Sequence, residues 1–290
     1  MLRSLFSAIS GLRANQTMLD VTGNNIANAN TVGFKSSNVV FQDTLSQMLT
    51  SSAAPATNTA GVTTGGTNPI QIGLGVQVGG VSTNFNQGSA QVTGKATNMM
   101  ISGDGFFVIH RGAQEMYTRA GAFNFDSTGN LVTPDGDIVQ GYGPDSAGTG
   151  IDTTTAPGNI TITDLATPPA SGAKLQSYNI GTDGVITGIY DDGTKKPLFQ
   201  IAMADFSNPE GLEKVGDTAF RSSTNSGTAQ IGTPSSGRRG SLMTGSLEMS
   251  NVDLAAEFTN LIIAQRGFQA TSRVITTSDQ VLEELVNIKR

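Results

Sequence analysis

The chain has 290 residues with one histidine, His110, no cysteine and a formal net charge of −6. The missing cysteines exclude disulfides and thiolate metal sites, and a single histidine excludes a multi-histidine zinc site. Charged residues make up only 14 % of the chain, which also contains 36 glycines. This composition predicts a surface of Ser, Thr, Asn and Gly, and the acidic balance argues against nucleic-acid binding, which needs a basic face.

The sequence also argues against a membrane protein. No stretch approaches the ~18 uninterrupted apolar residues that a membrane span needs. Serines interrupt the apolar residues of the first ten positions, whereas a secretory signal peptide has a continuous apolar core. We therefore expect neither membrane insertion nor a cleaved signal peptide.

Apolar residues near the N-terminus recur every seven positions. The main series is accompanied by a second, weaker one, and together they comprise Leu2, Leu5, Ile9, Leu12, Leu19 and Ile26. This spacing is typical of a helix that packs against other helices. It predicts a helix and its exit turn over residues 1–35.

The C-terminal segment, 250–290, has the longest regular pattern in the chain. The repeat of seven and one flanking aromatic comprise Leu254, Phe258, Leu261, Phe268, Ile275 and Leu282. Ser250 followed by Asp253 fits a helix start, and the absence of proline from 251 to 288 predicts a helix of roughly 55 Å. A helix this long suggests a coiled coil with the N-terminal helix, although the two helices could also simply close a monomer core.

The middle of the chain has the pattern of a β-structure. Four Asp-Gly dipeptides at 104, 135, 183 and 192 are turn signals, and short apolar runs lie at 105–109, 122–125, 136–139, 185–189 and 198–203. We predict an α+β protein with a central, mainly antiparallel β domain of hairpins over 76–249. Residues 145–173, rich in Pro, Thr and Gly, are expected to form a flexible insertion.

Residues 36–75 are predicted to form an extended linker. The part from Thr50 to Asn68 has no charge and, apart from Val62, no large apolar residue. Such a segment cannot bury enough surface to hold itself together. We expect its backbone groups to find no hydrogen-bond partners within the segment itself, so that the isolated segment is extended or disordered.

The sequence offers no constellation for catalysis or metal binding. His110 adjoins Arg111 at the end of an apolar run, and there is no Gly-x-Ser-x-Gly motif. The carboxylates at 135–137 and 191–192 lack the further ligands of a calcium loop and fit hairpin turns instead. We therefore expect no catalytic residue, cofactor or metal site, and no enzymatic activity.

Three blocks of sequence resemble the bacterial flagellar axial proteins, the rod and hook subunits. The first runs from Gly23 to Lys35, the second includes 103–108 and 117–123, and the third begins at Ser250 and includes 264–268. The residues that carry the resemblance in the first and third blocks are Asn24, Asn25, Asn28, Thr31, Gly33, Phe34, Ser250, Asn251, Asp253, Gln265 and Arg266.

The resemblance implies a structural subunit that is exported through the flagellar secretion channel and polymerises into a helical tube. Its implied partners are copies of itself, other axial proteins, cap and junction proteins and the export apparatus. Residues 66–76 and 204–212 look most like a hook subunit in a short form, with the distal rod subunit of the basal body as the alternative. An alternative from another class, a secreted or cell-surface β-domain binding protein, leaves both heptad ends unexplained.

Overall fold

The structure, a computed structural model, describes residues 2–57, 63–145, 150–162 and 174–288. The chain forms two compact units, each assembled from separate stretches of sequence. Unit 1 comprises Met1–Ala27, Ser37–Thr83 and Asp253–Arg290, and unit 2 comprises Asn28–Ser36 and Asn84–Val252. Terminal helices and a central antiparallel sheet confirm the predicted α+β class.

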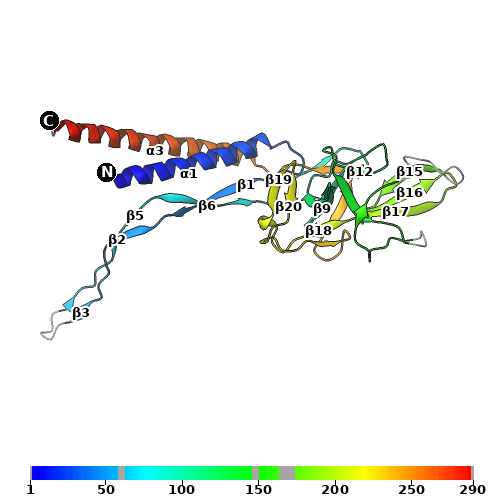
Figure 1. Ribbon diagram of the computed structural model, residues 1–290, viewed down its shortest axis with the longest axis horizontal. Helices are drawn as coiled ribbons and strands as arrows, with labels where there is room; N and C mark the ends of the chain where they lie inside the picture. Colours follow the sequence, from blue (N-terminus) through cyan, green and yellow to red (C-terminus); the bar gives the residue numbers. More distant parts are fainter. Residues whose placement is uncertain (1, 58–62, 146–149, 163–173, 289–290) are drawn as a thin grey trace. The chain divides into compact units, whose positions relative to one another are not determined.

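Two helices form one part of unit 1. Helix α1 (Leu2–Ala27) packs along α3 (Leu254–Ile288), and the two run side by side in Figure 1. The predicted pairing of the terminal helices is confirmed, but α3 begins three residues later than expected. Asp253 caps it, since its Oδ1 accepts from the backbone N–H groups of Ala255 and Ala256 at 2.9 and 3.3 Å. Ser250, the expected cap, accepts only from Val252 N at 3.4 Å.

A two-stranded antiparallel ribbon forms the other part of unit 1. In it β1 (Ser37–Asp43) pairs with β6 (Val76–Thr83), β2 (Ser46–Thr50) with β5 (Ile70–Gly73), and β3 (Ala56–Thr57) with β4 (Thr63–Thr64). Ala53 and Thr67 exchange two backbone hydrogen bonds of 3.0 and 2.9 Å. The expectation that 50–68 lacks internal partners was therefore wrong for its described residues; Val62 lies outside them. Residues 76–83, which the sequence analysis grouped with the central domain, pair with β1.

Unit 2 is built on a mainly continuous antiparallel sheet. The principal strand order in this sheet is β15-β16-β17-β13-β9-β10-β20-β19. In the same sheet, β11 pairs with β12, β12 and β14 pair with β13, and β18 pairs with β9 and β21. Two strand pairs, β22 with β8 and β23 with β7, lie outside this sheet. The strands are β7 (Ala90–Val92), β8 (Met99–Ser102), β9 (Phe106–Arg111), β10 (Gln114–Thr118), β11 (Asn124–Phe125), β12 (Leu131–Val132), β13 (Ile138–Tyr142), β14 (Gly158–Asn159), β15 (Leu175–Ile180), β16 (Val185–Tyr190), β17 (Lys195–Ile201), β18 (Met203–Asp205), β19 (Glu213–Gly216), β20 (Ala219–Arg221), β21 (Gln230–Gly232), β22 (Ser241–Thr244) and β23 (Ser246–Glu248); one 3-10 turn, η1, spans Pro209–Gly211.

Three of the four Asp-Gly dipeptides make the expected hairpin turns. They connect β12 to β13, β15 to β16, and β16 to β17, and their glycines have positive φ. Asp104-Gly105 is different, because β8 before it pairs with β22 and β9 after it pairs with β10, β13 and β18. At that position the sequence predicts a turn correctly but a hairpin wrongly.

The central strand β9 separates two apolar cores. Phe107 and Ile109 point into one, and Phe106 and Val108 into the other, because side chains alternate along a strand. The first core also contains Ile160 and Ile162, which are 0 % and 2 % exposed. The expected flexible insertion at 145–173 is therefore anchored in the core over this part. Its residues 146–149 and 163–173 lie outside the described residues.

The protein is expected to lose stability at alkaline pH, because a tyrosine is buried in the second core. Tyr117 is 2 % exposed, and burial, followed by the nearby Glu115 carboxylate, raises the pKa of its phenol to about 12. Folding thus favours the protonated phenol, so its stabilising contribution is complete below the unfolded pKa of ~10 and is lost as the pH rises toward about 12. We expect urea denaturation, followed by circular dichroism, to show about 2 kcal/mol lost over this window. Tyr117→Phe should lose less; equal losses in both chains would contradict the assignment.

Candidate functional site

Most of the predicted helix-packing residues are partly shielded from solvent. Of the residues on α3, Leu254 and Phe258 are exposed. Only the backbone of Leu2 belongs to the described residues. The other nine are half-buried: Leu5, Ile9, Leu12, Leu19 and Ile26 on α1, and Leu261, Phe268, Ile275 and Leu282 on α3.

Small residues set the closest approach of the two helices. A Cβ added at Gly11 would lie 3.2 Å from Thr271 Cγ2, and one added at Gly267 would lie 2.7 Å from Asn15 Oδ1. Ala8 and Ala264 are buried nearby on α1 and α3. Gly267 lies in the interior of α3, where glycine lowers helix propensity, and the contact with Asn15 gives it a packing role.

Asn25 connects three segments of unit 1. Its amide Nδ2 donates to Ser37 O at 2.8 Å and to Glu257 Oε1 on α3 at 2.9 Å, and its Oδ1 accepts from Ser37 N at 3.0 Å. The side chain is 1 % exposed. Asn25 thereby joins α1 to β1 and α3.

Large apolar side chains remain exposed over much of unit 1. They lie on both strands of the ribbon, along α3 and, for Phe6, on α1. The group comprises Phe6, Val40, Phe41, Leu45, Met48, Leu49, Ile70, Ile72, Leu74, Val78, Val81, Leu254, Phe258, Ile262, Ile263, Val274, Val281, Leu285, Val286 and Ile288. Extensive exposed apolar surface of this kind marks an interaction site.

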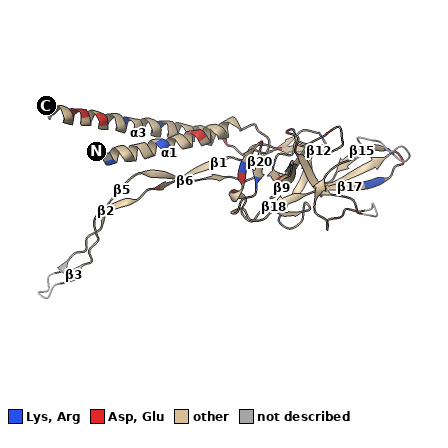
Figure 2. Cartoon of the chain, in the orientation of Figure 1, with Lys and Arg blue, Asp and Glu red and all other residues tan. Residues whose placement is uncertain are grey.

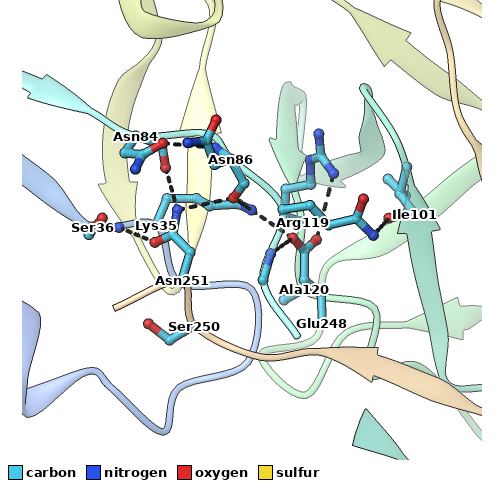
Figure 3. Close-up of polar contacts among 12 residues, drawn as sticks. Lys35, Ser36, Asn84, Asn86, Ile101, Arg119, Ala120, Glu248, Ser250 and Asn251 are labelled. Carbon is cyan, nitrogen blue, oxygen red and sulfur yellow. Dashed lines mark hydrogen bonds and ion pairs between the residues drawn. The ribbon is translucent and has the colours of Figure 1, made fainter. Parts of the chain in front are cut away.

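In unit 2, two further signature residues, Gly33 and Asn251, take part in one polar cluster, and Figure 3 shows the contacts around Asn251. Gly33 N donates to Glu248 O at 2.8 Å, and Ser36 N donates to Asn251 Oδ1 at 2.8 Å. The Nδ2 of Asn251 donates to the carbonyls of Asn84 and Asn86 at 2.8 and 3.0 Å. One asparagine side chain thereby holds together segments that are far apart in the sequence.

A buried charged group lies inside this cluster. Lys35 Nζ donates to Glu248 Oε1 at 2.7 Å and to Asn86 O at 2.8 Å, and both charged side chains are 0 % exposed. Arg119 NH1 lies 3.6 Å from Glu248 Oε2 and donates to Gly103 O at 2.9 Å. Burial lowers the pKa of Lys35 and of Arg119, and the Glu248 carboxylate opposes both shifts. Such a group holds its segments in one arrangement because each charge depends on its partners.

The ion pair was not predicted from the sequence. Lys35 and Arg119 lie in two of the blocks that resemble flagellar axial proteins, but neither they nor Glu248 were expected to have a functional role. The signal that could have indicated a buried ion pair is a single charged residue within a stretch of apolar and small residues. Nothing in the linear sequence indicates that residues 213 positions apart meet.

The other signature residues are distributed over the surface of their units. Phe34 lies beneath Lys214, whose Nζ is 5.0 Å from the ring centroid, and burial lowers the pKa of this lysine. Thr31 Oγ1 donates to Asn28 Oδ1 at 3.1 Å. Asn24, Gln265 and Arg266 are exposed.

Gly33 meets the backbone of a neighbouring segment at very short range. It has φ +70, and a Cβ there would lie 2.5 Å from Ala120 N. Gly94 has the same φ but nothing within 4 Å of its added Cβ. We expect Gly33→Ala to destabilise unit 2 by roughly 2 kcal/mol more than Gly94→Ala, because only Gly33→Ala adds a collision to the conformational strain.

Tyrosine fluorescence during urea denaturation can measure this difference. The chain has four tyrosines, at 117, 142, 178 and 190, and no tryptophan, so the signal comes from unit 2 alone. Equal destabilisation by the two substitutions would contradict the close packing at Gly33.

The described residues provide no group of three or more His, Cys, Asp or Glu side chains that could hold a metal ion. His110 lies on β9, with its Nε2 3.7 Å from Glu115 Oε1. Over the same part of the chain, no helix combines the length and apolarity needed to cross a membrane. The features that stand out are the contact surfaces of unit 1 and the polar cluster of unit 2.

Three family profiles match the chain in order. "Flagella basal body rod protein" matches residues 5–35, "Flagellar hook protein FlgE/F/G D1 domain" matches 100–188, and "Flagellar basal body rod FlgEFG protein C-terminal" matches 243–288. The first and third matches cover most of α1 and α3, and the second covers β8 to β16 of unit 2.

Individual relatives match from end to end. The flagellar basal-body rod protein FlgG of Bacillus subtilis is 46 % identical over 291 residues, which cover all of both chains. FlgG of Caulobacter vibrioides is 34 % identical over 97 % of each chain, and the hook protein FlgE of Borreliella burgdorferi is 31 % identical over an alignment of 446 residues that covers all of both. These matches and the fold agree with the resemblance found in the sequence: the chain belongs to the family of flagellar rod and hook proteins, which are structural components of the bacterial flagellum.

Proposed function

We propose that this chain is a rod subunit of the flagellar basal body and polymerises into a helical tube through unit 1. The observation that carries polymerisation is the exposed apolar surface of α3 and the ribbon, which a monomer leaves in water. Each large side chain of this kind gains about 1.5–3 kcal/mol on full burial. The nine half-buried heptad residues hold the helix pair together, and the exposed residues make contacts between copies.

Chain length favours a rod subunit, whereas the motifs in the sequence favoured a hook subunit. The alignment with FlgG of Bacillus subtilis spans 291 residues, almost the length of this chain. Alignments with three FlgE relatives need 424 to 468 positions. The hook subunit remains the second candidate, supported by the 31 % identity with FlgE of Borreliella burgdorferi.

The proposal also includes the partners and the route of export. Other axial proteins would meet the ends of the tube, with cap and junction proteins among them. The subunit would leave the cell through the flagellar export apparatus. The absence of cysteine suits passage of an unfolded chain through a narrow conduit, because no disulfide can form on the way.

Electron microscopy of the concentrated, purified chain tests the polymer directly. We expect tubes from the full chain and none from a chain without residues 2–27 and 254–288. A full chain that remains monomeric under all assembly conditions would contradict the proposed function. Deletion of the flagellar gene for this chain, followed by microscopy of isolated basal bodies, then separates the candidates: loss of the rod supports the rod subunit, and loss of the hook alone supports the hook subunit.

The ribbon is expected to determine the stiffness of the tube. Met48, Leu49, Ile70 and Ile72 are exposed on its paired strands and offer apolar contacts to neighbouring copies. Removing residues 51–64 should give a tube that still assembles but bends more readily, because a shorter ribbon fills less of the space between subunits. The persistence length of negatively stained tubes measures this effect, and unchanged stiffness would show that the end of the ribbon is only a tether.

A further inference from the structure

Two segments from opposite ends of its sequence meet in unit 2. Residues 28–36 precede the ribbon, and residues 246–251 comprise β23 and the chain that follows it. We call them the closing segments. Hydrogen bonds connect them, from Gly33 N to Glu248 O, from Lys35 Nζ to Glu248 Oε1 and from Ser36 N to Asn251 Oδ1. These bonds can form only when both ends of unit 2 are present.

The apolar cores of unit 2 are built mainly from the chain between the closing segments. Among the described residues, the buried members of both cores lie between Met99 and Phe220, except for Leu242. Several strands in this range pair with the next strand along the chain, as β9 does with β10 and β15 with β16. Such pairs join residues that are close in sequence, so they cost little loop-closure entropy. The interior strands can therefore make their contacts before the closing segments arrive.

Buried charge makes it unfavourable for either closing segment to dock alone. If residues 28–36 docked first, the Lys35 ammonium would leave water without the Glu248 carboxylate that accepts from it at 2.7 Å. If residues 246–251 docked first, Arg119, at 3.6 Å, would be the remaining cation of the ion group around Glu248. Charged residues are sparse in this chain, as Figure 2 shows, so substitute partners are few. Because an unpaired buried charge is strongly unfavourable, we expect the two segments to dock together.

We propose that the closing segments dock last in the folding of unit 2, with the Lys35–Glu248 ion pair as the latch that holds them. The strands between Met99 and Arg221 assemble first, and the latch closes only after the chain has been made as far as Asn251. This order keeps unit 2 open while the chain is being synthesised, which suits a subunit that is exported unfolded. That use rests on the proposed function, whereas the folding order does not depend on it.

Folding and unfolding rates in urea test this order. Tyrosine fluorescence follows the interior strands, because all four tyrosines lie between Tyr117 and Tyr190. Lys35→Met should raise the unfolding rate about a hundredfold or more and change the refolding rate by less than about twofold, because contacts absent from the transition state affect unfolding alone. Asn251→Ala, which removes amide contacts and no buried charge, should raise the unfolding rate about tenfold with refolding equally unchanged.

Val108→Ala is the contrasting variant. Val108 is 0 % exposed on β9, within the strands that are proposed to assemble first. Its substitution should therefore slow refolding about fivefold. If Lys35→Met and Asn251→Ala slow refolding by as large a factor as they reduce the folding equilibrium constant, the latch is already closed in the transition state and the proposed order is overturned.

Thiol labelling provides a second, independent readout, since the chain has no cysteine. Ser246 on β23 is 3 % exposed, and Ala204 on β18 is 0 % exposed. Below the urea midpoint, Ser246→Cys should react with N-ethylmaleimide at least about tenfold faster than Ala204→Cys, because the closing segments open while the interior strands stay folded.

Urea denaturation of the two cysteine variants corrects the labelling rates for any difference in overall stability. Equal corrected rates would show that the closing segments open only when the whole of unit 2 unfolds, and would overturn the latch. Neither the kinetic nor the labelling measurement requires tubes. Failure of the latch therefore leaves the polymer proposal intact, and absence of tubes from the unmodified chain overturns the polymer proposal alone.

Discussion

Phe268→Asp is expected to abolish tube formation while unit 2 stays folded. Phe268 is half-buried on the side of α3 that contacts α1, next to the tightly packed Gly267. A carboxylate there would be removed from water without a partner, at a cost of several kcal/mol in every copy. Leu261→Asp should have the same effect, because Leu261 lies one heptad earlier on the same helix.

Two measurements separate helix packing from a general folding defect. Electron microscopy should show no tubes, and circular dichroism should show reduced helix content. The tyrosine fluorescence of unit 2 should remain that of the unmodified chain, because all four tyrosines lie in that unit. Gln269→Asp, at an exposed position of the same turn, is the control and should assemble. Normal tubes from Phe268→Asp would disprove the assignment of this residue to the helix contact.

Lys35→Met is expected to destabilise unit 2 by about 3–5 kcal/mol. The substitution keeps much of the apolar stem but removes the charge that faces Glu248 at 2.7 Å. Glu248 then lies buried with Arg119 as its remaining cationic neighbour, at 3.6 Å. The carbonyl of Asn86 also loses the donor provided by Lys35 Nζ.

The double variant Lys35→Met with Glu248→Gln should recover a large part of this loss. It removes both partners of the ion pair, and the glutamine Oε1 can still accept from Gly88 N, which donates to Glu248 Oε1 at 2.9 Å. Urea denaturation followed by tyrosine fluorescence measures the three stabilities. If the double variant is less stable than Lys35→Met by the full cost of a second independent substitution, the two side chains are not coupled as the structure indicates.

The sequence by itself determined the periodic and local features of this protein. Repeats of seven predicted two terminal helices, which the structure contains as α1 and α3. Alternating apolar runs with Asp-Gly turns predicted the antiparallel sheet, because strand period and turn conformation depend on residues close in sequence. Blocks of sequence at both ends also carried the resemblance to flagellar axial proteins.

Only the tertiary structure decided which groups are paired or buried and which side chains remain exposed to solvent. The ribbon of 37–83 was not predicted because its pairing depends on hydrogen bonds between backbone groups, which weakly patterned side chains do not reveal. The partnership of Lys35 with Glu248 required two distant segments to meet in a buried site. Likewise, the heptad pattern of α3 did not distinguish the half-buried residues, such as Leu261 and Phe268, from exposed ones, such as Leu254 and Phe258, because all of them have helical spacing. A neighbouring helix, rather than the spacing itself, determines which of those residues are buried.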